Sequence, residues 1–226
     1  MAEQPEHTFL FADLAGFTAL TEAMGDEEAA DLAGRFGSAV EERLPEYRAE
    51  AIKSIGDALM IKSERASDAV KLGLEIVHEV GGQHFFPTVR VGMDTGEAVG
   101  RGGDWFGATV NLAARVSGIA AGDEVLLTEA TRTAAGTVEA VEIREHGRHK
   151  LKNVVEPVLL YAAVREGQRS ATGLPIDPVC RMAVDPEHCA GSLFHEGTEF
   201  HFCSLECAAL FAGSPERYAE PAGSPE

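Results

Sequence analysis

A pair of aspartates could hold divalent cations at one edge of a sheet. Asp13 ends the short apolar run TFLFAD (8–13), and Asp57 follows a glycine in the turn of an expected hairpin. Adjacent strands would bring both carboxylates to the same edge, and Mg²⁺ needs only one or two carboxylates when phosphates and water complete its coordination shell. For either aspartate alone a structural role is the favoured explanation, with Asp13 as a helix cap and Asp57 as an ordinary turn residue. The pairing of the two is therefore what favours a metal site.

An amide and a guanidinium share one face of an expected helix. Asn111 and Arg115 are four positions apart in a segment, 110–119, whose apolar spacing predicts a helix. Aimed at a phosphate group, they would stabilise the negative charge that builds on its oxygens in a transition state. The alternative is a solvated polar face on a surface helix.

The cysteines are confined to the last quarter of the chain, at Cys180, Cys189, Cys203 and Cys207. Cys203 and Cys207 are four apart, so a helix would present both thiols on one side, and Cys180 on a loop can add a third. In a reducing compartment this clustering favours a metal over disulfides, and thiolates favour Zn²⁺, Cu(I) or iron. The fourth ligand stays open between His201, His195 and Cys189. The alternative is a set of buried structural thiols without metal.

The elements that must position these side chains are strands mixed with helices. We predict strands at 8–13, 49–54, 58–63, 88–94, 124–128 and 157–164, helices at 16–24, 26–44, 66–80 and 110–119, and a short helix between the last two strands. Pro45 is expected to stop the second helix, and residues 95–107 are expected to form a glycine-rich connection. Such a chain packs its helices on one sheet, in an α+β or α/β arrangement.

Length and composition limit the possible functions. The 226 residues are 45% hydrophobic and 25% charged, which suits one globular domain of ordinary size plus a small one. The formal net charge of -18 lacks the basic footprint of a nucleic-acid binder, and an acidic surface repels anionic lipid. Without a signal peptide or a run of about 18 apolar residues, the expected location is cytoplasmic. A change in composition predicts one domain at 1–165, a linker at 166–174 and a second domain at 175–226.

The first 165 residues resemble the catalytic domain of class III adenylate and guanylate cyclases. The matching stretches, in the family's order, are FADLAGFT (11–18), KSIGDALM (53–60), RVGMDTGEAVG (90–100) and DWFGATVNLAAR (104–115). Asp13 and Asp57 are also 44 positions apart, as in the family. The resemblance implies a ferredoxin-like α+β fold, conversion of ATP to cyclic AMP and pyrophosphate, and two Mg²⁺ or Mn²⁺ ions held by these aspartates. It also implies a head-to-tail homodimer with active sites at the interface.

The resemblance assigns Asn111 and Arg115 to the transition state, and Lys53 and Asp104 to the purine. A lysine donor and a carboxylate acceptor complement the N1 acceptor and 6-amino donor of adenine, whereas guanine presents the reverse. The alternative for Lys53 is an exposed strand lysine.

The terminal phosphates are assigned to a helix start and to one lysine. Backbone N–H groups at a helix start can hold anions, and the residues concerned are Leu14, Ala15, Gly16 and Phe17. The lysine is Lys152, for which Lys150 is the alternative.

The end of the chain, at 175–221, resembles a YHS domain of the TRASH-like metal-binding group. The matching stretches are DPVCRM (177–182), FHFCSLEC (200–207) and SPERY (214–218). The resemblance implies that Cys180, Cys203 and Cys207 bind Zn²⁺, copper or iron, with His201 as a candidate fourth ligand. A module of under fifty residues has a small core, which also favours a metal.

Two further interpretations concern GGDWF (102–106) and the isolated histidines. GGDWF is similar to the GGDEF signature of diguanylate cyclases, but Trp105 replaces a required acid and the hairpin tip is expected at Gly56-Asp57. His84, His146 and His149 show no partner spacing and are expected at the surface.

A different class of function, a metal-responsive nucleotide-binding regulator with an inactive cyclase domain, is disfavoured because all the catalytic residue types are present.

Overall fold

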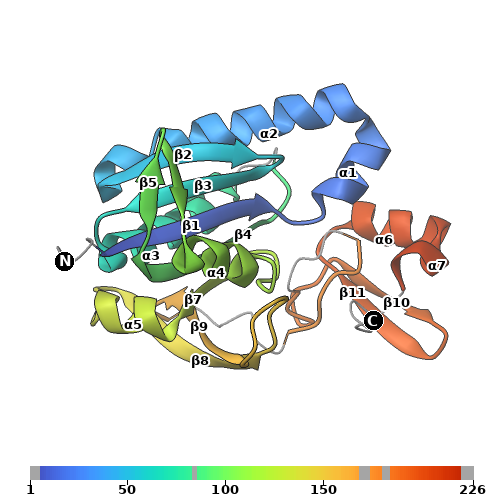
Figure 1. The fold of residues 1–226 in the computed structure, drawn as a ribbon. Coiled ribbons are helices and arrows are strands. Elements are labelled where there is room, and N and C mark those ends of the chain that lie inside the picture. Colours follow the sequence, from blue (N-terminus) through green and yellow to red (C-terminus); the bar gives the residue numbers. More distant parts are fainter. Residues whose placement is uncertain (1–5, 83–85, 168–173, 180–183, 220–226) are drawn as a thin grey trace.

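A seven-stranded mixed sheet dominates the computed structural model, which describes residues 6–82, 86–167, 174–179 and 184–219 (Figure 1). The strand order is β2-β3-β1-β4-β7-β9-β8, in which β4 and β7 run parallel and all other neighbours antiparallel. The strands are β1 (Glu6–Leu14), β2 (Ala49–Ile55), β3 (Ala58–Ser63), β4 (Val89–Glu97), β7 (Val125–Thr128), β8 (Val141–His149) and β9 (Val158–Arg165). The predicted mixed sheet with helices is confirmed.

Helices cover both faces of this sheet. They are α1 (Phe17–Met24), α2 (Asp26–Glu41), the 3₁₀ turn η1 (Leu44–Tyr47), α3 (Ala66–Glu75), its π-helical continuation η2 (Ile76–Val80), α4 (Ala108–Ser117) and α5 (Glu129–Ala135). Helices α2, α3 and α5 contribute to the core on one face, and α4 covers the other. None of the described helices is long and apolar enough to cross a lipid bilayer.

Strand β1 sends alternate side chains to the two faces, following the two-residue period of a strand. Leu10 and Leu14 are buried with α2 and α3, whereas Phe9 and Phe11 are buried on the α4 side. Asp13 has the parity of Phe9 and Phe11. It therefore lies on the α4 side, at the carboxyl end of the strand.

Helix α4 packs directly against the backbone of β4 at Gly92. A Cβ atom at this position would lie 1.9 Å from the backbone nitrogen of Ser117 and 2.4 Å from its Cα. Only glycine permits so close an approach of helix and strand. Backbone contact therefore sets the height of α4 above the sheet, and with it the position of Asn111 and Arg115.

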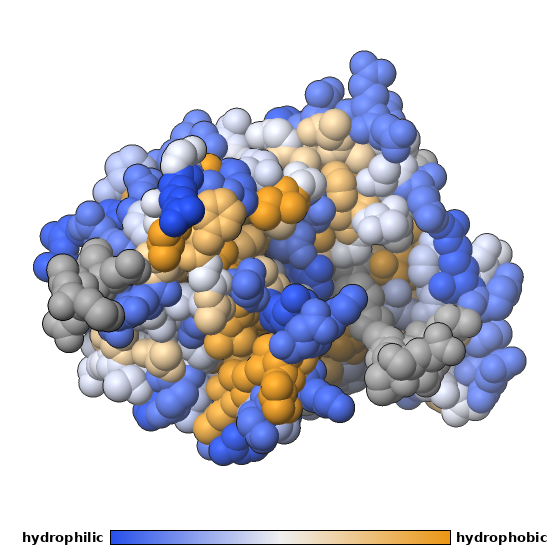
Figure 2. All heavy atoms as spheres, viewed as in Figure 1, coloured by the Kyte–Doolittle hydropathy of each residue, from blue (hydrophilic) through white to orange (hydrophobic). Residues whose placement is uncertain are grey.

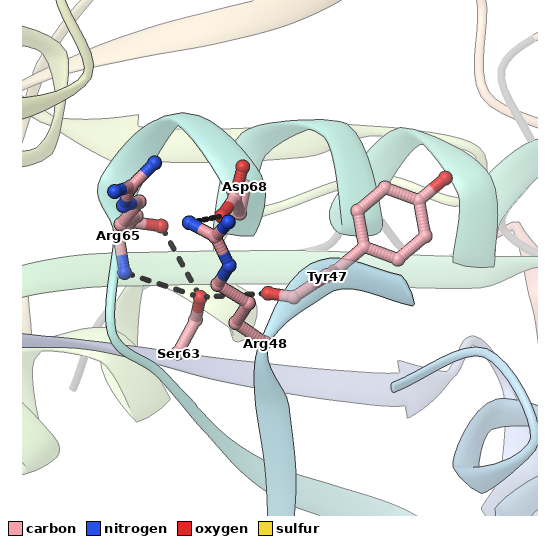
Figure 3. A network of polar contacts seen from close by, with 5 residues as sticks. All are labelled: Tyr47, Arg48, Ser63, Arg65 and Asp68. Carbon is pink, nitrogen blue, oxygen red and sulfur yellow. Dashed lines mark hydrogen bonds and ion pairs between the residues drawn. The ribbon is translucent and has the colours of Figure 1, made fainter. Parts of the chain in front are cut away.

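A buried serine ties the base of the β2–β3 hairpin to α3 (Figure 3). The Ser63 hydroxyl, in a side chain that is 0% exposed, lies 3.2 Å from the carbonyl oxygen of Arg65 and 3.4 Å from that of Tyr47. Arg48 turns the chain at φ 49°, and its guanidinium lies 3.9 Å from the carboxylate of Asp68 on α3. These contacts fix the hairpin whose turn carries Asp57.

The predicted glycine-rich connection is wrong in part, because it folds as a second hairpin. Strands β5 (Val99–Arg101) and β6 (Asp104–Phe106) pair across Gly102 and Gly103, which both have positive φ. GGDWF therefore does lie at a hairpin tip, and only Trp105 in place of an acid still separates it from the diguanylate cyclase signature.

Two other elements differ from the sequence prediction. Helix α2 ends at Glu41, and Pro45 lies in the first turn of η1, where a missing N–H is tolerated. Strand β8 was not predicted, because its sequence VEIREHGRH is rich in charge. It is the edge strand of the sheet, where polar side chains reach water.

The C-terminal part is a small unit beside α1 (Figure 1). It contains the hairpin β10 (Gly191–His195) and β11 (Thr198–Phe202), and the helices α6 (Leu205–Gly213) and α7 (Pro215–Tyr218). Its core is small and centres on Phe202, Cys207 and Phe211. Arg217 of this unit forms an ion pair with Glu22 of α1.

Candidate active site

The two predicted metal-binding aspartates meet at the end of the sheet where β1 ends and β3 begins. Strands β1 and β3 are antiparallel neighbours with Ala12 opposite Leu59, so the β2–β3 turn that holds Asp57 lies beside Asp13. Burial, reinforced by the neighbouring Asp13 carboxyl, raises the pKa of Asp57 to about 7, and backbone N–H groups lower it in part. The Asp57 carboxyl therefore lies close to the Asp13 carboxyl at the end of β1.

Arg90 is a third member of this edge that sequence reasoning did not assign. It is the second residue of β4, directly opposite Asp13, and its Nε and Nη2 atoms lie 2.8 and 2.5 Å from Asp13 Oδ2. The guanidinium offsets part of the negative charge of the acid pair. The signal was present in the sequence, because Arg90 opens the RVGMDTGEAVG stretch, but the pairing register with β1 was not known.

The acid pair fits divalent cations. Its donors are all carboxylate oxygens, the ligands that Mg²⁺ and Mn²⁺ prefer. Burial is the main cause of the raised pKa of Asp57, and the neighbouring Asp13 carboxyl adds a smaller electrostatic repulsion. A cation bound between them would remove that repulsion.

The predicted phosphate-binding turn is only partly available. Gly16, at φ 75°, precedes the first residue of α1, Phe17, so the helix starts where the sequence predicted. The N–H of Ala15, however, donates to the carbonyl of Thr88 at 2.7 Å, and the N–H of Leu14 faces Asp57. The remaining N–H groups, at Gly16 and Phe17, belong to a helix start, where N–H groups have no partner within the helix.

The predicted base-reading residues touch each other. Lys53 Nζ on β2 donates to Asp104 Oδ2 on β6 at 2.6 Å, and Asp104 Oδ1 accepts the N–H of Trp105 at 2.8 Å. The hydrogen bond from Lys53 lowers the pKa of Asp104, and the Trp105 N–H adds to this effect. Both side chains are about one third exposed. Strand β2 and the β5–β6 hairpin therefore present an ordered donor and acceptor side by side.

Asn111 and Arg115 lie on α4 with different exposure. Asn111 is exposed and Arg115 half-buried, while Val110 and Ala113 anchor the helix in the core against Phe9. Among the described residues, no hydrogen bond or ion pair joins Asn111 or Arg115 to the acid pair. Lys152 is exposed in the β8–β9 connection.

The two strand histidines are not isolated surface residues, contrary to the prediction. The side chain of His146 is 13% exposed and contacts both His149 and the buried Glu124. His84 lies outside the described residues.

The candidate thiol site in the C-terminal part includes a buried carboxylate. Single ligand atoms of Asp177, Cys203 and Cys207 all lie within 4.8 Å of one another, and the two sulfurs are 3.7 Å apart. Asp177 is 0% exposed and accepts the N–H groups of Val179 and Cys203 at 2.9 Å each. These donors fit a soft or borderline cation such as Zn²⁺.

Other predicted ligands lie elsewhere. Cys180 lies outside the described residues. Within the described part of the chain, His201 and His195 do not belong to that cluster. Cys189 lies apart, with its thiol 3.4 Å from the carbonyl oxygen of Pro186. Asp177 was missed because a carboxylate before a proline has the signature of a turn residue.

The chain is similar to several known proteins. A pH-sensitive adenylate cyclase, MT1302, from Mycobacterium tuberculosis (strain CDC 1551 / Oshkosh) is 35% identical over 169 residues, which cover 74% of this chain and 42% of that protein. An adenylate cyclase from Streptomyces coelicolor is 32% identical over 173 residues, covering 74% of this chain and 45% of that protein. The chain thus spans less than half the length of these relatives.

The fold has solved counterparts, and two families match the sequence. The crystal structure of the adenylyl cyclase CyaB from P. aeruginosa superposes with a TM-score of 0.60 at 23% identity, over 73% of this chain and 95% of that chain. Residues 176–222 match the YHS domain. Residues 1–162 match the adenylate and guanylate cyclase catalytic domain, and the chain belongs to this family.

Proposed function

We propose that this protein is an adenylate cyclase that converts ATP to 3′,5′-cyclic AMP and pyrophosphate. The proposal rests on the Lys53–Asp104 contact at 2.6 Å. Each group holds the other in place, so the site offers a fixed donor and a fixed acceptor to the purine edge. That pair complements adenine, whereas guanine would meet donor with donor and acceptor with acceptor.

The reaction requires charge control more than acid–base groups. The 3′-oxygen of the ribose attacks the α-phosphorus, its proton is lost, and the bond to the bridging oxygen of the leaving pyrophosphate breaks. Divalent ions bound by Asp13 and Asp57 would supply a lowered pKa at the 3′-hydroxyl and neutralisation of the leaving phosphates. Arg115 and Asn111 donate hydrogen bonds to the α-phosphate oxygens as their negative charge increases. Lys152 and the start of α1 hold the terminal phosphates.

The site is completed by a second copy of the chain. Lys53 lies on β2 and Asp57 in the β2–β3 turn that follows, so the two side chains are poorly placed to reach opposite ends of the same ATP. In a head-to-tail homodimer, each subunit gives its acid pair to one site and its base-reading pair to the other. The apolar side chains of Ile55 and Phe106 are 52% and 53% exposed close to the base-reading pair. Figure 2 shows apolar groups gathered over this face, and burial in a dimer would account for them.

The decisive assay is product formation. The purified chain should form cyclic AMP from ATP with Mn²⁺, and markedly less cyclic GMP from GTP. Wild-type preference for GTP would contradict the base-reading argument. Absence of both products, with nucleotide binding retained, would indicate a nucleotide-binding regulator instead.

We also propose that the chain has a cyclase domain at 1–165, a linker at 166–174 and a metal-binding domain at 175–226 that responds to metal or thiol state. The Arg217–Glu22 ion pair supports communication, because α1 follows the turn that is assigned to phosphate. Cobalt titration should give thiolate charge-transfer absorption that the double variant Cys203→Ser, Cys207→Ser loses. If Zn²⁺ and Cu⁺ change the cyclase rate equally in both proteins, the regulatory role is excluded.

A further inference from the structure

A β-bulge in the edge strand β8 brings two histidines together. Glu145 pairs with Tyr161 and Gly147 pairs with Leu160, so His146 is an extra residue in the strand. Residues three apart on a regular strand face opposite sides. The bulge, with Gly147 at φ 106°, re-aims His146 towards His149. Their ring centroids are 4.7 Å apart, and His146 Nδ1 lies 2.8 Å from His149 Nε2.

A buried carboxylate completes this cluster from another part of the sheet. Glu124 is 5% exposed and lies in the turn between α4 and β7. One of its oxygens is 3.1 Å from His146 Nε2, and the other accepts the N–H of Ala121 at 2.9 Å. With His146 Nε2 donating to Glu124, Nδ1 of a neutral His146 is an acceptor and His149 donates to it. Both oxygens of Glu124 and both ring nitrogens of His146 then have hydrogen-bond partners.

The cluster lies at the base of the segment that carries Lys152. The neighbouring Leu151 is 3% exposed and packs in one cluster with Val116 and Ala120, at the end of α4. Arg115 is on the same turn of that helix. Lys152 itself is exposed. Two anchors, one polar and one apolar, thus fix the Lys152 segment against the helix that carries Arg115.

We propose that Glu124, His146 and His149 are positioning residues that hold Lys152 in register with Arg115, and so set the affinity for the terminal phosphates of a nucleoside triphosphate. The inference rests on the phosphate role proposed above for Lys152. It gives the bulge and the buried carboxylate a purpose beyond stability. These positioning residues should affect nucleotide binding more than the chemical step, because Lys152 contacts phosphates that are remote from the bond being formed.

The test is a double-mutant cycle on the full chain. Lys152→Ala should raise KM for ATP about tenfold, as expected for losing a charge-assisted hydrogen bond. His149→Phe should raise KM about fivefold with kcat within about twofold, because the segment is no longer held. The double variant should match Lys152→Ala alone, since there is then no lysine left to position. Independent, multiplying effects would overturn the proposal, as would no effect of Lys152→Ala.

Conservative variants separate positioning from folding. His149→Gln keeps an N–H donor and should stay within about twofold of wild type. The partly exposed β8 residue Arg144, which pairs with Glu142 away from the histidines, serves as the matched control when changed to Gln and should leave KM unchanged. If His149→Phe fails to fold, the test compares Glu124→Gln with His149→Gln. Glu124→Gln should raise KM for ATP while His149→Gln leaves it unaltered, and equal, unaltered KM values in both variants would overturn the proposal. The same cycle, measured as Kd for ATP by calorimetry, remains readable without product formation, so a failure of cyclase activity is distinguished from a failure of positioning.

Discussion

Asp94 is a buried carboxyl that the proposed chemistry does not use. The effect of Asp94→Asn on the stability of the protein should reverse with pH. Its side chain is 5% exposed in β4, and Oδ1 accepts the hydroxyl of Thr128 at 2.5 Å. Burial raises the pKa of Asp94 to about 6, although hydrogen bonds from Thr128 and the Thr95 N–H oppose this. Relative to the ordinary value of 3.8, the difference of about 2 pKa units corresponds to about 3 kcal/mol.

The direction of the pH effect follows from the linkage between proton binding and folding. Because the folded-state pKa is raised, the favourable protonated state is fully available below about pH 4, and its contribution to stability is lost as the pH rises through 6. Asp94→Asn removes the charge but also one of two acceptors, which costs about 1 kcal/mol. The variant should therefore be less stable than wild type near pH 4 by about 1 kcal/mol, and more stable at pH 8 by about 2 kcal/mol.

Urea unfolding of both proteins at several pH values between 4 and 8 gives the difference between their free energies of unfolding. The exposed Asp31→Asn serves as a control for the loss of one negative charge. A difference between Asp94→Asn and wild type that stays constant across this range would refute the reasoning.

Three other predictions test the site and the fold. Lys53→Glu with Asp104→Cys should lower turnover of ATP and raise that of GTP relative to it, measured as the ratio of the two kcat/KM values; an unchanged ratio would remove these residues from base selection. Asp57→Ala and Arg115→Ala should each be nearly inactive, and their mixture should recover at most about a quarter of wild-type activity, because half of randomly exchanged C₂ dimers carry one intact site; no recovery after confirmed subunit exchange would mean that each site lies within one chain. Ser63→Ala should lower the free energy of unfolding by about 1 kcal/mol with little effect on nucleotide binding, because its buried hydroxyl joins two turns; chemical denaturation measures this.

Most strands and helices could be predicted because their apolar periods are strong. β1, β3 and β4 are dominated by buried residues, and α3 has a clear amphipathic pattern. The β5–β6 hairpin escaped prediction because each strand has three residues and glycine occupies the turn. β8 escaped because an edge strand can carry charge.

The candidate site was predictable where residue type and motif order agreed. Asp13, Asp57, Lys53 and Asp104 meet in the pairs expected of them. The contact between Arg90 and Asp13 depends on strand register, which the sequence alone does not provide. The contact between His146 and His149 depends on a bulge, since regular pairing would place the two rings on opposite faces.

The absence of a side chain at Gly92 has a consequence for sorting sequences of this family. Since α4 and β4 meet there backbone to backbone, even one methyl group would lift the helix and carry Asn111 and Arg115 away from their places. A gene duplicate could keep every catalytic residue and still lose turnover through this one position. Gly92 is thus a marker by which a degenerate copy could be recognised from sequence, independently of the catalytic motifs.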